Sequence, residues 1–271
     1  MLIGHTKQKK YFQNLIQNDA LGQAYLFSGP EMIGKKTFAL ELARSILGDN
    51  FVQSPDFKLV ANAGIEEIRN LKKFFSLKTY SGGRRVVIFD DAHSLTPEAA
   101  NAFLKTLEES PAGSVIILVS SMPSLILPTI LSRCEEVRFV PAGEKEVNIY
   151  LAGKKIKEQD KEFLVKLSGG RIGLINRLIE DDGIIEAKKA VDDLRKLLNS
   201  GIYEKMDYAK KIHEKGDYQP WINYWLNWVS ANVHNSPKNV KIVKNLLSLS
   251  SLVSQPQFNH RLALENFLLN L

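Results

Sequence analysis

The residues best suited to chemistry in this sequence are a lysine and two glycines near its start. Gly29 and Gly34 enclose a short loop, and Lys35 follows it directly. A strand-like run over 24–28 precedes the loop and a helix-like run over 37–43 follows it, which is the context that a phosphate-binding loop requires. In such loops backbone N–H groups hold phosphate oxygens at the helix N-terminus, and the lysine adds a positive charge. The pattern predicts a binding site for the phosphates of ATP or ADP.

The position after the lysine departs from this pattern. A phosphate-binding loop of an ATPase has Ser or Thr there, because its hydroxyl binds Mg²⁺. This chain has Lys36, a second cation without an acceptor, and Thr37 comes one residue late, about 100° further around the helix. We therefore expect ATP or ADP to bind weakly at most, Mg²⁺ to be held poorly, and ATP hydrolysis by the isolated chain to be undetectable.

Two carboxylates follow the apolar run at 86–89. Asp90 ends this predicted strand, and in a phosphate-loop sheet a carboxylate at that place reaches the Mg²⁺ ion. Asp91 stands where many such ATPases have a glutamate that orients the attacking water, and its side chain is one methylene shorter. A polar strand end or a helix cap is the alternative interpretation of the pair. The upstream glycine loop favours the nucleotide interpretation.

The composition is that of a soluble globular protein: 271 residues, of which 44% are hydrophobic and 24% charged, with a net charge of +6. The length allows about two or three domains. The single cysteine, Cys134, excludes an internal disulfide framework and a multi-cysteine zinc site, and it fits a reducing cytosol. No apolar run approaches the roughly 18 residues of a membrane span. The mild basic excess fits nucleic acid or an acidic partner, although the paired lysines and arginines are scattered.

Strand-like and helix-like segments alternate in the first half of the chain. Near-continuous runs of branched and aromatic residues indicate strands at 24–28, 57–61, 85–90, 114–120 and 137–140. Helical patterns lie between them, at 35–47, 65–78 and 96–109. This alternation predicts an α/β domain over residues 1–141, with a parallel sheet covered by helices on both faces.

Strand signals stop after residue 140, and helical patterns follow. They predict a small helical lid over 142–182 and an all-helical domain over 183–271. The three tryptophans, Trp221, Trp225 and Trp228, have the spacing of one helix face. We expect this face to lie in the core, with an exposed aromatic contact to a partner as the alternative.

Two motifs in the first half are more specific than the glycine loop. The run Thr-Pro-Glu-Ala-Ala-Asn-Ala-Phe-Leu-Lys-Thr-Leu-Glu-Glu at 96–109 and the Ser-Arg-Cys element at 132–134 resemble those of AAA+ clamp-loader subunits. Shorter matches lie at 3–5, 24–30 and 261–265. Within this family the chain looks most like the delta-prime subunits of bacterial DNA polymerase III, densely over 1–140 and thinly over 145–255.

The resemblance implies a role in opening and loading a sliding clamp. In this family the arginine of Ser-Arg-Cys is an arginine finger that reaches the ATP bound by a neighbouring subunit, and that role falls on Arg133. A surface arginine paired with Glu135 or Glu136 is the alternative. The implied partners are gamma/tau and delta subunits in a cytoplasmic hetero-pentamer, together with the clamp and primer–template DNA, and no membrane. Residues 183–271 would be the collar that ties the ring together.

Departures from the family pattern indicate a largely structural subunit. Lys36 and Asp91 replace residues that bind metal and orient water, and Gly173 falls where motor subunits carry a nucleotide-sensing arginine. Ser121, with Ser120 beside it, falls at the polar sensor position of the sheet. The four-cysteine zinc module of many relatives is absent, so no zinc is expected. An ATP-hydrolysing gamma/tau-type motor and another kind of AAA+ ATPase are the alternatives. The residues expected around nucleotide are Gly29, Gly34, Lys35, Lys36, Thr37, Asp90, Asp91 and Ser121.

Overall fold

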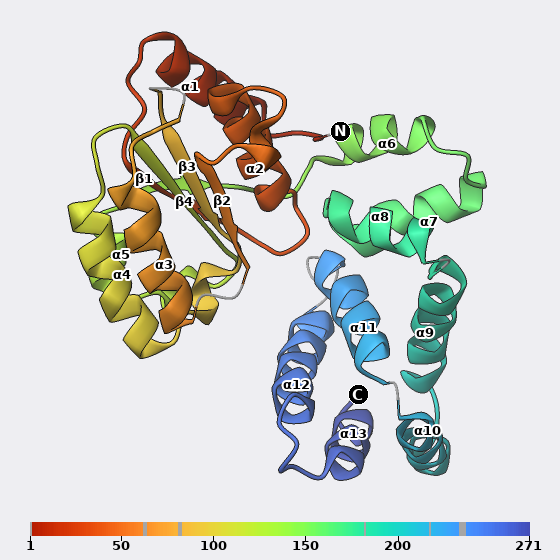
Figure 1. Cartoon of the computed structure of the whole chain (residues 1–271). Coiled ribbons are helices and arrows are strands. Elements are labelled where there is room, and N and C mark those ends of the chain that lie inside the picture. The colour runs from red at the N-terminus through yellow and green to blue at the C-terminus, as the bar shows by residue number, and fades with distance from the viewer. Residues whose placement is uncertain (1, 62–63, 81–82, 182, 217, 233–236) are drawn as a thin grey trace. The chain divides into compact units, whose positions relative to one another are not determined.

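A computed structural model describes residues 2–61, 64–80, 83–181, 183–216, 218–232 and 237–271. The chain divides into two compact units, residues 1–142 and 143–271 (Figure 1). The first unit combines a sheet with helices, and the described residues of the second form helices and loops. Within the described ranges, no helix is long and apolar enough to cross a membrane.

The first unit is built on a five-stranded sheet with the order β2-β3-β4-β1-β5. Its strands are β1 (Ala24–Ser28), β2 (Phe57–Val60), β3 (Arg85–Phe89), β4 (Ser114–Ser120) and β5 (Glu135–Arg138). All neighbouring strands run parallel, with Leu26 opposite Leu118 and Ile88 opposite Ile117 near the centre. Strands β1, β3 and β4 are buried along their whole length, as expected for apolar strands covered on both faces. The predicted α/β fold is confirmed.

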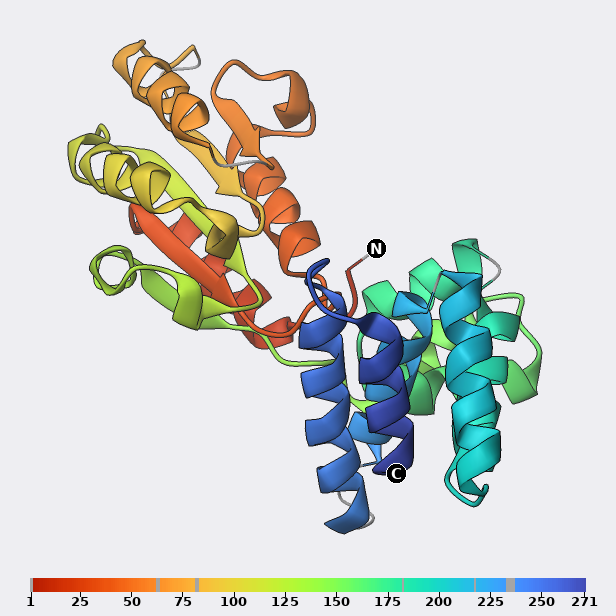
Figure 2. The same cartoon turned by 90° about the horizontal axis from the view of Figure 1, so that it is seen from below.

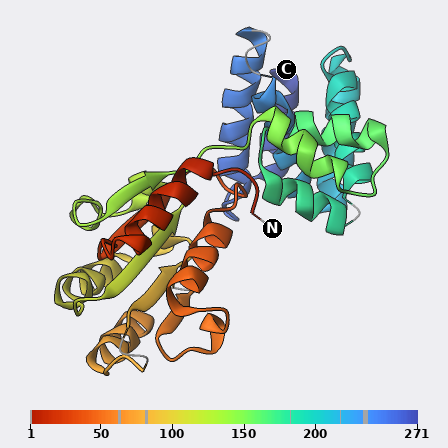
Figure 3. The same cartoon turned by 90° about the horizontal axis from the view of Figure 1, so that it is seen from above.

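Helices cover both faces of this sheet, as Figures 1 and 3 show. They are α1 (Thr6–Gln17), α2 (Lys35–Leu47), α3 (Ile65–Ser76), α4 (Pro97–Glu109) and α5 (Pro128–Leu131), with short 3₁₀ turns at Phe51–Gln53, Ala92–Ser94 and Pro123–Leu125. Helices α1 and α2 pack with Val86 and Phe27 in one buried cluster, and α3, α4 and α5 pack with Val87 and Leu26 in the other. Neighbouring strand residues point to opposite faces, so each strand contributes to both clusters.

Some boundaries differ from those expected from the sequence. The apolar pattern indicates a strand at 137–140, whereas β5 spans Glu135–Arg138. This strand lies at the edge of the sheet and only one of its four residues is buried, so its pairing with β1 sets its limits and an apolar pattern does not reveal them. The strand expected at 85–90 ends at Phe89, which places Asp90 just beyond the sheet.

The second unit is helical, as predicted. Its helices are α6 (Glu144–Ala152), α7 (Glu158–Ser168), α8 (Ile172–Glu180), α9 (Ile184–Leu197), α10 (Ile202–Lys215), α11 (Gln219–Ala231), α12 (Pro237–Val253) and α13 (His260–Leu269). Figure 2 shows α12 and α13 side by side. Trp221 and Trp225 are buried in the core that α9 to α13 share, and Trp225 Nε1 donates to the Ala190 carbonyl oxygen at 2.7 Å. The core interpretation is confirmed for these two tryptophans, whereas Trp228 is half-buried.

Helix α7, in the segment predicted as a lid, packs on helices of the predicted collar. The ring of Phe163 stacks on Trp228 of α11, with centroids 5.7 Å apart. Lys188 Nζ of α9 lies 2.5 Å from Asp160 Oδ1 of α7. Residues 143–271 therefore form one compact unit, and its division into a lid over 142–182 and a collar over 183–271 stays a prediction.

Candidate functional site

The glycine loop lies between β1 and α2 and has positive φ angles at both of its predicted phosphate-binding glycines. Gly29 and Gly34 have φ angles of 143° and 102°, which side chains other than glycine rarely adopt. A Cβ atom on Gly29 would lie 2.4 Å from the carbonyl oxygen of Phe139, just after β5. Gly34 precedes the first residue of α2, so the loop leads directly into the N-terminus of that helix. The predicted strand, loop and helix are present at the expected residues.

Lys35 is buried and bonded to the loop itself. Its Nζ atom donates to the carbonyl oxygens of Gly29 and Pro30, both at 2.6 Å. Burial lowers the pKa of Lys35, while the nearby charges of Glu31 and Asp91, followed by that of Asp90, oppose this shift. Two of the three ammonium protons are thus used by backbone oxygens of the loop.

Lys36 pairs with the carboxylate that was expected to reach a metal ion. Its Nζ atom lies 2.7 Å from Asp90 Oδ2, and the Asp90 side chain is 19% exposed while that of Lys36 is 46% exposed. The backbone N–H of Asp90 donates to the Val60 carbonyl oxygen, which fixes the residue at the end of β3. An ammonium group therefore takes the place beside Asp90 where a cation would bind.

Ser121 also reaches the loop. Its Oγ atom donates to Glu31 Oε1 at 3.4 Å, which joins the end of β4 to the glycine loop. Ser120 beside it is fully buried and contacts His93 Nδ1 at 3.4 Å. The structure thus brings Ser121 to the predicted site, and it adds Glu31, an acidic residue in the loop.

Thr37 and Asp91 lie next to this group, and Asp91 interacts with Lys35 through its charge. Thr37 is exposed on the first turn of α2. Asp91 is exposed with φ of 50°, and its carbonyl oxygen accepts a hydrogen bond from Ser94 at the start of a 3₁₀ turn. The described residues contain no group of three or more His, Cys, Asp and Glu side chains that could hold a metal ion.

Arg133 lies just after α5, on the face of the sheet that α3, α4 and α5 cover. Its Nη2 atom donates to Glu108 Oε1 of α4 at 2.5 Å, and its Nη1 atom donates to the Thr129 carbonyl oxygen at 2.9 Å. The side chain is 41% exposed. These two contacts use two of the five N–H donors of a guanidinium group, so donors are left for a further ligand.

The alternative ion pairs suggested for Arg133 by the sequence are wrong. Glu135 accepts a hydrogen bond from the Tyr11 hydroxyl, and Glu136 accepts one from Ser28 Oγ at 2.5 Å. Both glutamates belong to β5 and join it to α1 and β1. The partner of Arg133 comes from α4, 25 residues earlier in the chain.

Residues 4–143 match a protein family described as DNA polymerase III, delta subunit. This match covers more than half of the chain. The chain belongs to this family. The resemblance seen in the motifs at 96–109 and 132–134 is thereby confirmed.

Two relatives of this delta-family chain are named DNA polymerase III subunit delta'. That of Pseudomonas aeruginosa is 30% identical over 207 residues, which cover 66% of this chain and 62% of the relative. That of Bacillus subtilis is 28% identical over 210 residues, which cover 70% of this chain and 64% of the relative. The matches thus span less than two thirds of the length of either relative.

A solved structure shares the fold. It is a DNA polymerase III gamma subunit-related protein of Thermotoga maritima, with a TM-score of 0.50 and 22% identity. The alignment covers 95% of this chain and 97% of that protein. At this identity the likeness supports an α/β domain followed by helices and nothing finer.

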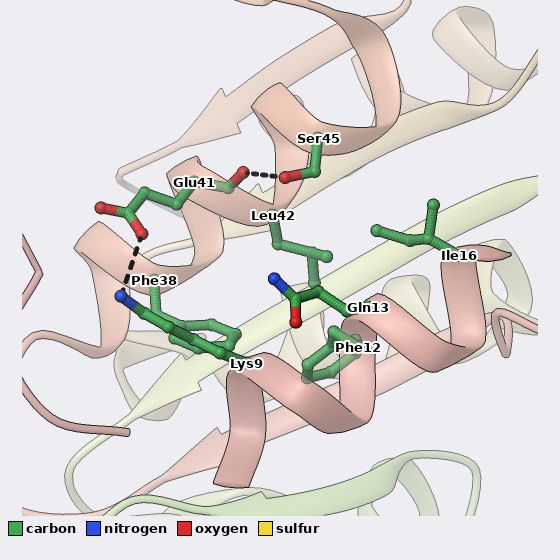
Figure 4. Close-up of a pocket in the computed structure, with 8 residues that line it drawn as sticks. All are labelled: Lys9, Phe12, Gln13, Ile16, Phe38, Glu41, Leu42 and Ser45. Carbon is green, nitrogen blue, oxygen red and sulfur yellow. Dashed lines mark hydrogen bonds and ion pairs between the residues drawn. The ribbon is translucent and has the colours of Figure 1, made fainter. Parts of the chain in front are cut away.

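The delta-family chain also has a groove between α1 and α2, shown in Figure 4. Its volume is about 220 Å³, and an ion pair between Lys9 and Glu41, 3.9 Å apart, lies at its side. It is lined by Lys9, Phe12, Gln13, Ile16, Phe38, Glu41, Leu42 and Ser45. None of these residues is among those predicted to bind nucleotide, so the groove is separate from the glycine loop.

Sequence reasoning missed Glu31 and Glu108. An acidic residue inside the glycine loop was a visible signal for Glu31, because it places a negative charge near expected phosphates. No signal distinguished Glu108 from Glu109, since both end the same helix. Their partners differ: Glu109 lies 2.9 Å from Lys72 Nζ of α3, and Glu108 binds Arg133.

Proposed function

We propose that the chain is a delta-prime-like subunit of the DNA polymerase III clamp loader. It is a largely structural AAA+ ring member that helps to load the sliding clamp on primed DNA, and it supplies Arg133 to the ATP site of a neighbouring subunit. The observation that carries this proposal is the position of Arg133: half-exposed, with guanidinium donors to spare. A guanidinium stays charged and forks onto phosphate oxygens, which suits it to act on ATP bound elsewhere.

The chain's own loop is proposed to bind ATP or ADP weakly, if at all, and to hold Mg²⁺ poorly. Lys36 already pairs with Asp90, and Lys35 is bonded to loop carbonyls. The Glu31 carboxylate adds a negative charge near the place where phosphates would lie. These three features support a subunit that does not hydrolyse ATP by itself.

The proposed partners are gamma/tau and delta subunits in a cytoplasmic hetero-pentamer, with the clamp and primer–template DNA reached through the complex. The names of the relatives support this assignment. The helical unit offers apolar surface for such contacts, because Leu247, Leu262 and Leu269 on α12 and α13 are about half exposed. In contrast, Leu246 and Leu249 of α12 are buried in the core of the unit.

The test is the ATPase activity, stimulated by DNA and clamp, of the complex assembled from this chain and its cognate subunits. We expect Arg133→Ala to lower the rate, because an arginine finger contributes about 10³-fold or more at its site. The decrease in the total rate is smaller, since other sites in the ring keep their own fingers. Arg133→Lys should be nearly as poor, because an ammonium cannot reproduce the planar fork. The complexes with Arg133, Arg133→Ala and Arg133→Lys are matched for assembly by size-exclusion chromatography. Equal rates for the three would contradict the proposal.

An ATP-hydrolysing motor of the gamma/tau type is the second candidate. The preserved geometry of Gly29 and Gly34, with Lys35 and Asp90 in place, favours it. The isolated chain decides between the two: steady Mg²⁺-dependent turnover would favour the motor, and its absence favours the structural subunit.

A further inference from the structure

We propose that Glu108 is a positioning residue for Arg133, an inference that rests on the proposed arginine-finger function. Glu108 Oε1 accepts a hydrogen bond from one terminal nitrogen of the guanidinium, and the Thr129 carbonyl oxygen accepts one from the other. Two anchors on different elements thus hold the guanidinium plane of Arg133. The remaining N–H donors are left for phosphate oxygens.

Both anchors belong to elements that are fixed by packing. Thr96 caps the N-terminus of α4, and its side chain accepts a hydrogen bond from the Ala99 N–H. Its Phe103 ring is buried and lies 4.7 Å from the ring of Phe89 in β3. On α5, Ile130 is fully buried directly after Thr129. The backbone segments that carry the two anchors are therefore fixed relative to the sheet.

The two glutamates at the end of α4 have different partners. Glu109 lies 2.9 Å from Lys72 Nζ and joins α4 to α3, the neighbouring helix. Glu108 lies 2.5 Å from the Arg133 guanidinium. Both pairs are exposed ion pairs, with side chains between 41% and 68% exposed. Glu109 is therefore a matched control, because it has the same charge and helix but a different partner.

The gain from the Glu108 contact lies in geometry rather than in folding stability. Exposed ion pairs contribute little to the stability of the fold. A long arginine side chain loses conformational freedom when it binds phosphate, and contacts that fix it beforehand reduce that loss. The negative charge of Glu108 weakens the attraction between Arg133 and phosphate, so a decrease in rate on its removal would identify positioning as the larger effect.

The experiment compares assembled clamp loaders that carry Glu108→Ala, Glu108→Gln, Glu109→Ala, Arg133→Ala, and Glu108→Ala combined with Arg133→Ala. We expect Glu108→Ala to lower the finger-dependent part of the stimulated kcat by about two- to tenfold, as for coupled neighbouring residues, with KM for ATP unchanged. Glu108→Gln should restore part of the rate, because its amide oxygen can still accept a hydrogen bond from Arg133. Glu109→Ala should match the unaltered complex.

The double variant separates positioning from a structural role. If Glu108 acts through Arg133, the double variant should be no slower than Arg133→Ala alone, whereas independent effects would multiply. With Arg133→Ala slow, three outcomes would overturn the positioning role. They are a multiplied loss in the double variant, an unchanged rate for Glu108→Ala, and an increased rate for Glu108→Ala. An unchanged rate for Arg133→Ala would overturn the arginine finger and the positioning role together.

Discussion

The glycine loop and the segment around Arg133 use their positive charges in opposite ways. In the loop, Lys35 is buried and bonded to backbone oxygens of the loop itself, and the half-exposed Lys36 is paired with Asp90, whose side chain is 19% exposed. Arg133 pairs with Glu108 at the surface, where both side chains are about half exposed. The exposed Arg133 can use its remaining donors for a ligand without a change in the fold, whereas a buried group such as Lys35 needs a structural change before it can bind one.

The difference indicates which of the two sites can bind an added phosphate group with donors that are not already used. A phosphate that enters the glycine loop has to compete with contacts that the chain already makes to its own lysines. A phosphate that approaches Arg133 finds unused donors on a group held by two anchors. This contrast supports the proposal that the chain binds its own nucleotide poorly and acts on a neighbour's.

The largest expected effect comes from separating the two units. A chain that ends at residue 142 keeps the loop, Arg133 and both buried clusters of the first unit, so we expect it to fold but not to join the clamp loader. Residue 142 is a better end point than 183, because α7 packs on α9 and α11. Circular dichroism checks the fold, and sizing with cognate subunits checks incorporation. A truncated chain that still enters the complex would show that the collar assignment is wrong.

A second prediction concerns Cys134, the inward neighbour of the outward Arg133. Burial raises the pKa of Cys134 from 9.0 to about 11. At pH 8 we expect iodoacetamide to react about a hundredfold more slowly with the folded chain than with the denatured chain, because the thiolate is the nucleophile. Since the folded state binds this proton more tightly, the contribution of Cys134 to stability is present below pH 9 and is lost as the pH rises through 11. Similar rates at pH 8 would mean that the segment opens to solvent.

A third prediction tests whether Lys36 closes the loop to metal. Lys36→Thr frees Asp90 and restores a hydroxyl at the Mg²⁺ position, so we expect ATP to bind about tenfold more tightly in Mg²⁺, or about 1.4 kcal/mol. Lys36→Met is the control, since it removes the ammonium without adding a metal ligand. Titration calorimetry with Mg²⁺ and with EDTA measures the difference. Tight Mg²⁺-dependent binding of ATP by the unaltered chain would contradict the claim that the contacts of Lys35 and Lys36 weaken nucleotide binding in the glycine loop.

The smallest expected effect is that of Arg133→Ala on folding. Removing one exposed arginine should change the free energy of unfolding by less than about 0.5 kcal/mol. Arg85 is the contrasting control, because it is buried and lies 3.4 Å from Asp56, itself buried. Arg85→Ala should cost about 3–5 kcal/mol, as expected when a buried ion pair loses one partner. Denaturant unfolding measures both variants, and a large loss for Arg133→Ala would make Arg133 a structural residue.

The central strands and the glycine loop could be predicted from the sequence because the signals for them are local. Buried apolar runs fixed the central strands, and the two glycines fixed the loop, since few residues adopt their backbone angles. The edge strand β5 was misplaced because three of its four residues are exposed and carry no apolar pattern. Its limits depend on pairing with β1, which is a long-range effect.

The partners of the charged side chains could not be predicted in the same way. The sequence showed that Lys36 stands where a hydroxyl is expected. It did not show that the ammonium of Lys36, on α2, reaches Asp90 at the end of β3. Likewise, Glu135 and Glu136 were the nearest acidic residues to Arg133 along the chain, whereas Glu108 is the nearest in space. Such contacts arise from the packing of separate elements, and spacing along the chain does not encode them.

Gly29 shows how the fold itself can require a residue of a motif that is named for nucleotide binding. Any larger residue there would collide with the Phe139 carbonyl oxygen, so folding alone is enough to retain the glycine. Lys35 is under a similar constraint, because its ammonium satisfies two carbonyl oxygens of the loop. In a descendant that had lost ATP binding altogether, selection for a folded chain would still preserve Gly29 and Lys35. Position 36 is more informative about function. The side chain there is 46% exposed, so packing does not restrict which residue it can be.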